Sequence, residues 1–146
     1  MEREGKRALD QLIPALPHRP EEGDVREMLL AAWTSYIEAV GSDPVTWRLV
    51  LMPPEGAPES LRHRIAEARR MIVEMLAAAI SRGIVEDHVS PDPEFTARVL
   101  IAVADETARL ILTQPGEYPV ERVLDQARWL LDQVSLPSKS AAARIA

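Results

Sequence analysis

The chain has 146 residues, of which 47% are hydrophobic and 27% are charged, and it contains no cysteine. This length is typical of one globular domain with a hydrophobic core of its own. The lack of cysteine excludes disulfide scaffolds, cysteine nucleophiles and cysteine-based zinc sites. The formal net charge of −6 argues against a chain that wraps nucleic acid, because such proteins displace phosphate counterions with an excess of Lys and Arg. No apolar stretch has the length of a membrane span or resembles a secretory signal, so we expect no membrane partner and a cytoplasmic location.

Apolar residues recur at helical spacing in the first third of the chain. Residues 2–16 are expected to form a first helix, which the prolines that follow bring to an end. Asp24 and Glu27 form a capping pair at the start of a second helix. Gly41 is expected to end that helix by adopting the left-handed conformation.

Two Asp-Pro pairs predict further helix starts, since Asp caps a helix and Pro fits its first turn. Asp43-Pro44 starts a short helix through Leu51, and a long helix over roughly 59–82 follows a proline-rich turn. Asp92-Pro93 starts a helix over 93–114. It has apolar residues around most of its circumference, so we expect it to be buried on most sides.

A last helix is predicted from Pro119 to about residue 134, with residues 135–146 as a tail. Trp129 lies off its apolar stripe. The last two helices together are too apolar for one small domain, and two-fold self-association is the usual way to bury such a face. The alternative is that the helix over 93–114 is the central helix of a monomeric bundle.

The sequence carries no familiar catalytic motif, and we expect neither enzymatic activity nor a cofactor nor a metal site. His18, His63 and His88 are interpreted as solvated. Asp105 and Glu106 are adjacent carboxylates inside an apolar helix, where burial can shift a pKa or position a polar group. The simpler expectation is that Asp105 pairs with Arg109, and that Glu106 pairs with Arg109 or with a group on another helix.

Aromatic and apolar residues concentrate on the second to fourth predicted helices. They are suited either to lining an apolar cavity between helices or to filling the core. Spacing alone does not decide between the two. The residues are Trp33, Tyr36, Ile37, Trp47, Leu51, Met71, Ile72 and Met75.

The order of these elements resembles the C-terminal half of a TetR-type transcriptional regulator. The resemblance covers roughly residues 5–134 and rests on the order and spacing of four segments. They are Ser42-Asp-Pro-Val-Thr-Trp-Arg-Leu-Val-Leu-Met-Pro-Pro-Glu-Gly56, Ile80-Ser-Arg-Gly83, Asp92-Pro-Glu-Phe-Thr-Ala-Arg-Val-Leu100 and Leu112-Thr-Gln-Pro-Gly-Glu-Tyr-Pro119.

The resemblance implies an all-α, six-helix bundle that binds a small hydrophobic or amphipathic effector among its middle helices. Its last two helices would pair with those of a second copy in a four-helix dimer interface. By resemblance, the ligand-binding residues are Trp33, Tyr36, Trp47, Ile72, Met75, Val103 and Glu106, beside Ile37 and Leu51. The interface residues are Leu100, Ala104, Ile111, Val123, Ala127 and Leu131.

The sequence departs from the TetR pattern at its start, because no helix-turn-helix segment precedes Met1. An isolated sensing domain, a shortened sequence, a misassigned start codon and natural loss of DNA binding would each produce this beginning. We expect a ligand-sensing and dimerisation domain over 1–134, with DNA as a partner only if such a segment precedes Met1 in the full gene product. The alternative function is a small helical adaptor that binds another protein and has no cavity.

Overall fold

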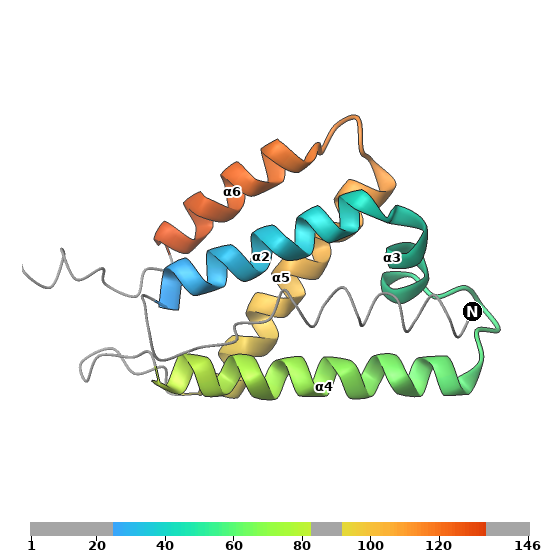
Figure 1. Cartoon of the computed structure of the whole chain (residues 1–146), viewed down its shortest axis with the longest axis horizontal. Helices are drawn as coiled ribbons and strands as arrows, with labels where there is room; N and C mark the ends of the chain where they lie inside the picture. The colour runs from blue at the N-terminus through green and yellow to red at the C-terminus, as the bar shows by residue number, and fades with distance from the viewer. Residues whose placement is uncertain (1–24, 83–91, 134–146) are drawn as a thin grey trace, which may run out of the picture.

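The computed structural model describes residues 25–82 and 92–133, and within these ranges every regular element is a helix (Figure 1). The expected all-α class is therefore confirmed for the described residues. The expected first helix over 2–16 and the expected tail over 135–146 lie outside them, so the expected total of six helices is not tested. The helices are α2 (Val25–Ser42), α3 (Pro44–Leu51), α4 (Glu59–Arg82), α5 (Pro93–Thr113) and α6 (Val120–Gln133).

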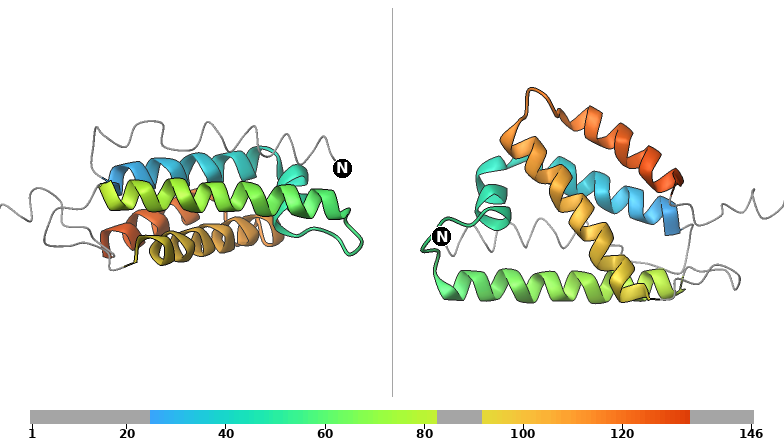
Figure 2. Two further views of the ribbon diagram at one scale, coloured as in Figure 1. Left: turned by 90° about the horizontal axis from the view of Figure 1, so that it is seen from below. Right: turned by 180° about the vertical axis from the view of Figure 1, so that it is seen from behind.

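The helices are arranged in two layers. α2 and α4 lie in one layer, and α5 and α6 lie in the layer behind it (Figure 2). α5 runs diagonally and packs against α2, α3 and α4, whereas α6 packs against α2. The outer side of α5 faces away from the other layer, as the view from behind shows (Figure 2).

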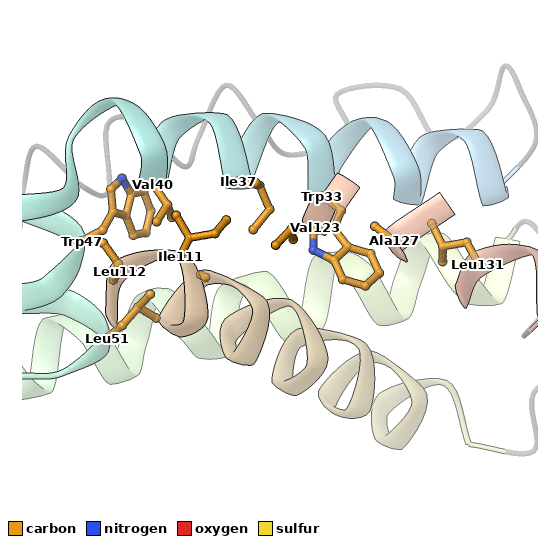
Figure 3. Close-up of a cluster of buried hydrophobic side chains, with 11 residues drawn as sticks. Trp33, Ile37, Val40, Trp47, Leu51, Ile111, Leu112, Val123, Ala127 and Leu131 are labelled. Atoms are coloured by element: carbon orange, nitrogen blue, oxygen red, sulfur yellow. The ribbon is translucent and has the colours of Figure 1, made fainter. Parts of the chain in front are cut away.

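The main core joins four of the helices where the two layers meet (Figure 3). Large side chains from α2 and α3 pack against the small and branched side chains of α5 and α6. Ile37, Val40 and Trp47 are almost completely excluded from solvent. The other members of this cluster are Trp33, Leu51, Ala108, Ile111, Leu112, Val123, Ala127 and Leu131.

A second, smaller cluster holds the C-terminal half of α4 against the N-terminal half of α5. Val73 and Ile80 of α4 pack against Ala97 of α5, and the half-buried Leu100 and Ile101 extend this contact. α4 is therefore attached to α5 mainly at one end, and the side chain of Arg69 connects it to α5 further along.

Both Asp-Pro helix starts are confirmed. The Asp43 side chain accepts a hydrogen bond from the backbone N–H of Thr46 at the start of α3, and the Asp92 side chain accepts one from Phe95 at the start of α5. Each carboxylate satisfies an N–H that has no partner inside the helix. The other end of α5 is capped by Arg48, whose Nη2 donates to the carbonyl of Leu112 at 2.8 Å.

The expected role of Gly41 is wrong. Gly41 lies inside α2, which continues to Ser42, and its φ is not positive. A Cβ built on Gly41 would meet a methyl carbon of Val120 at 3.2 Å. Gly41 therefore lies where the end of α2 closely approaches the start of α6, and a larger residue there would need Val120 to shift by a few tenths of an ångström. Gly56 is the described residue that does adopt a positive φ, of 85°, in the turn before α4.

None of the helices within 25–82 and 92–133 combines the length and the hydropathy that a membrane span needs.

Candidate functional site

A buried carboxylate connects three helices. Asp105 of α5 accepts a hydrogen bond of 2.8 Å from the Tyr36 hydroxyl of α2 through its Oδ1. Its Oδ2 lies 2.6 Å from Nη1 of Arg69 on α4. We call these three residues the polar bridge. Because a buried charge is costly unless it is paired, Asp105 requires both partners from elements far apart in the sequence.

The two ends of the ion pair in the polar bridge differ in exposure. The Asp105 side chain is 9% exposed, whereas the Arg69 side chain is 43% exposed. Oδ2 is buried, and within the described residues its contact with Arg69 lacks the alignment of a hydrogen bond. The carboxylate is thus neutralised by Arg69 but still has an unused capacity to accept a hydrogen bond.

The Tyr36 hydroxyl remains a neutral donor. Burial, together with the negative charge of Asp105, holds the pKa of Tyr36 well above its ordinary value. The ring of Tyr36 also meets Trp47 edge to face, with 5.3 Å between the ring centroids. Tyr36 is thus held between the apolar core on one side and Asp105 on the other.

A second polar contact joins α2 to α5 beside the polar bridge. Nε1 of Trp33 donates to Oγ1 of Thr107 at 3.1 Å, and this hydroxyl donates to the carbonyl of Ala104 at 2.7 Å. The indole N–H is therefore satisfied although Trp33 is buried.

The expected partners of Asp105 and Glu106 are half correct. Glu106 does lie near Arg109, at 3.8 Å. Asp105 does not pair with Arg109 in the structure, because its side chain points between α2 and α4 and meets Arg69 instead. Helical spacing predicts only pairs within one helix, and it has no means of finding a partner on another element.

The expected ligand-binding residues fall into three environments. Trp33, Ile37, Trp47 and Leu51 are buried in the main core, and Tyr36 is in the polar bridge. Ile72 is half-buried on α4. Met75, Val103 and Glu106 are exposed. Val103 is two positions from Asp105, so the two side chains leave α5 on opposite sides.

The expected interface residues lie mostly inside the chain. Ile111, Val123, Ala127 and Leu131 are buried in the main core, and Ala104 packs against it. Leu100 packs against the smaller cluster. These side chains are occupied by contacts within one copy, which the apolar periodicity of a helix cannot distinguish from contacts between copies.

The excess apolar surface expected on the last two helices lies on the outer side of α5, on residues other than those first expected at an interface. Phe95, Val99 and Val103 are 64%, 46% and 37% exposed, so the expectation that this helix is buried on most sides is wrong for the single chain. With Glu106 and the half-buried Leu110 they recur every three or four residues, and we call these five residues the outer stripe. The signal was present in the sequence, because these residues lie opposite Ala97, Ala104 and Ala108 on the helix. On α6, Trp129 is 53% exposed, in agreement with its position off the apolar stripe.

The histidine interpretation is confirmed where it is tested. His63 is exposed on α4 and lies 3.4 Å from Glu67, while His18 and His88 are outside the described residues. Within the described ranges, no three His, Cys, Asp or Glu side chains come together as a metal site would require.

Comparison with known proteins identifies the family. A family model described as Tetracyclin repressor-like, C-terminal domain, matches residues 25–136. Because this match covers most of the chain, the chain belongs to that family, as the sequence resemblance indicated. Such domains are regulatory rather than catalytic, and ligand binding and dimerisation are their general roles. Neither the curated proteins nor the solved structures contain a significant match.

Proposed function

We propose that this domain senses a small hydrophobic or amphipathic molecule and acts as a homodimer. Family membership carries this proposal, because ligand binding and dimerisation are the general roles of the family. The polar bridge and the outer stripe supply a location for each role, and they lie on different sides of α5.

The ligand is proposed to bind beside the polar bridge, between α2, α4 and α5. Ile72 lies one turn after Arg69 and on the same side of α4, where it offers a half-buried apolar contact. Tyr36 offers both an aromatic ring and a hydroxyl. Trp33, Ile37, Trp47 and Leu51 would support this region from the core rather than line it, since they are already packed.

The dimer surface is proposed to be the outer stripe of α5, extended by Trp129 of α6. Four of the five residues in the outer stripe are apolar, and apolar area is costly to leave in water, at about 25 cal/mol per Å². Tryptophan is common among the residues that dominate binding energy at interfaces. Val103 and Glu106 are thus assigned to the interface, whereas most of the residues first expected there are core residues.

The proposed mechanism is a shift between populations. A ligand that fits beside the polar bridge better in one arrangement of α2, α4 and α5 favours that arrangement. Because α5 carries both the bridge and the outer stripe, the shift would reach the second copy directly. In a regulator with DNA-reading domains, it would change the spacing of those domains.

The dimer is tested by Val99→Glu, which places a charge in the middle of the outer stripe. Val45→Glu is the matched control, because Val45 is 62% exposed on α3 and outside the outer stripe. Sedimentation at micromolar concentration should show a dimer for the wild type and for Val45→Glu, and a monomer for Val99→Glu. A wild-type monomer would exclude self-association and favour the adaptor, in which the outer stripe binds another protein.

Ligand sensing is tested with a panel of small hydrophobic molecules. Binding beside the polar bridge should raise the unfolding temperature and change the emission of Trp47, which contacts Tyr36. Ile72→Ala should weaken binding, whereas Val45→Ala should not. A panel without any thermal shift or fluorescence change would contradict the sensing role.

A further inference from the structure

The ion pair in the polar bridge is asymmetric. Asp105 is fixed, because its side chain is 9% exposed and its Oδ1 accepts the hydrogen bond from Tyr36. The Arg69 side chain is long, flexible and 43% exposed. Its guanidinium can therefore turn into solvent, where water hydrates the charge. An exchange of partners at this site would therefore replace the guanidinium and retain the carboxylate.

This asymmetry decides which charge a ligand can carry. An anionic ligand that captured Arg69 would leave Asp105 buried without a counterion, which is strongly unfavourable. A cationic ligand that captured Asp105 would release Arg69 to water, and no charge would be left buried and unpaired. The remaining hydrogen-bond capacity of Oδ2 also requires a donor, not an acceptor.

We propose that the effector is an amphipathic organic cation whose N–H group takes the place of Arg69 at Asp105. This inference rests on the proposed ligand-sensing function and specifies its ligand class. Arg69 acts as a placeholder that neutralises Asp105 in the empty domain. The apolar part of the ligand lies along Ile72, which follows Arg69 by one turn on the same side of α4.

The neighbouring charges do not offer a second placeholder. Arg109 is the other arginine whose positive charge acts to lower the pKa of Tyr36, and its side chain is 38% exposed. Its carboxylate partner is Glu106 on the outer side of α5, at 3.8 Å. The exchange therefore involves Arg69. Trp47 packs edge to face on Tyr36, so its fluorescence should respond to the exchange.

The test compares three probes with the same alkyl chain: decylammonium, 1-decanol and decanoate. Binding to the whole protein is measured by titration calorimetry and by tryptophan emission. Decylammonium should bind on the order of tenfold more tightly than 1-decanol, as expected for a hydrogen bond to a charged group. Decanoate should bind most weakly.

Two variants distinguish a placeholder from a ligand contact. Arg69→Gln should tighten decylammonium binding several-fold, because the competing cation is gone, whereas a residue that contacts the ligand would weaken it. Arg70→Gln is the matched control on the same helix and should leave the affinity unchanged. Asp105→Asn should abolish the preference for the cation over the alcohol.

Each outcome has a defined meaning. If all three probes and the panel of small hydrophobic molecules fail to bind, the proposed sensing function is wrong, and the ligand class falls with it. If members of the panel bind but none of the three probes does, sensing stands and the cation proposal is overturned. If 1-decanol or decanoate binds as tightly as decylammonium, sensing stands and the cation proposal is overturned. If Arg69→Gln binds decylammonium no better than the wild type, the placeholder role is overturned, even when Asp105→Asn does not fold.

Discussion

The Tyr36 hydroxyl on α2 donates a hydrogen bond of 2.8 Å to Asp105 on α5, although 69 positions separate the two residues in the sequence. The same carboxylate pairs with Arg69 on α4. The Asp105 side chain thereby connects three helices. A substitution of any one of the three residues should therefore alter the contacts of the other two.

Removal of the Tyr36 hydroxyl should destabilise the domain. Tyr36→Phe keeps the ring against Trp47 but leaves buried Oδ1 of Asp105 without its donor, at a cost of about 1–3 kcal/mol in the free energy of unfolding. Tyr118→Phe is the control, since its ring lies over Arg122 outside the polar bridge. If urea unfolding showed the same loss of unfolding free energy for both variants, the hydrogen bond to Asp105 would not be important for stability.

The raised pKa of Tyr36 predicts a loss of stability in alkali. In the unfolded chain the phenol ionises near its ordinary pKa of about 10, whereas in the folded chain it stays protonated above that pH. The unfolded state therefore binds fewer protons, and the free energy of unfolding falls as pH rises. Above pH of about 10, urea unfolding should show a steeper fall for the wild type than for Tyr36→Phe, by up to about 1.4 kcal/mol per pH unit. Parallel profiles would show that Tyr36 ionises normally.

Two isoleucines expected to bind ligand should behave differently. Ile37 has no exposed surface, so Ile37→Ala should cost about 2–5 kcal/mol of unfolding free energy by opening a cavity in the main core. Ile72 is half-buried, and Ile72→Ala should cost about half of that or less while it weakens ligand binding. Thermal unfolding with and without a ligand separates the two effects. A large stability loss from Ile72→Ala without any change in affinity would make Ile72 a core residue.

The start of α5 depends on the Asp92 side chain. Asp92→Ala removes the acceptor that lies 3.0 Å from the Phe95 N–H and should cost about 1 kcal/mol. Asp92→Asn should retain most of the stability, because an amide oxygen can also accept this hydrogen bond. Hydrogen exchange at the Phe95 amide should accelerate in the alanine variant and remain slow in the asparagine variant. Unchanged exchange in both would mean that α5 begins independently of this cap.

Local features of the fold were predictable because their causes are local. The Asp-Pro pairs predict the starts of α3 and α5, since the cap and the proline act within one turn. The proline-rich turn predicts where α4 begins. Gly41 shows the limit of this reasoning, because the close neighbour of this position is Val120, which lies on a helix distant in sequence.

Partners on other helices were not predictable from one sequence. Periodicity gives Val123, Ala127 and Leu131 an apolar face, but only the packing of α6 on α2 places that face inside the chain. The same packing leaves Phe95, Val99 and Val103 on the outside. The proposed dimer surface therefore comes from the tertiary structure, although its residues are among the most apolar in the sequence.

The sequence by itself determined the helical class, most helix boundaries and the family, because caps, prolines and apolar periodicity act over a few residues and keep their order along the chain. Only the tertiary structure decided that Asp105 meets Tyr36 and Arg69. The physical reason is that a buried carboxylate must be neutralised by whatever donors the packing brings to it, and the packing of α2 and α4 on α5 is set by many side chains together.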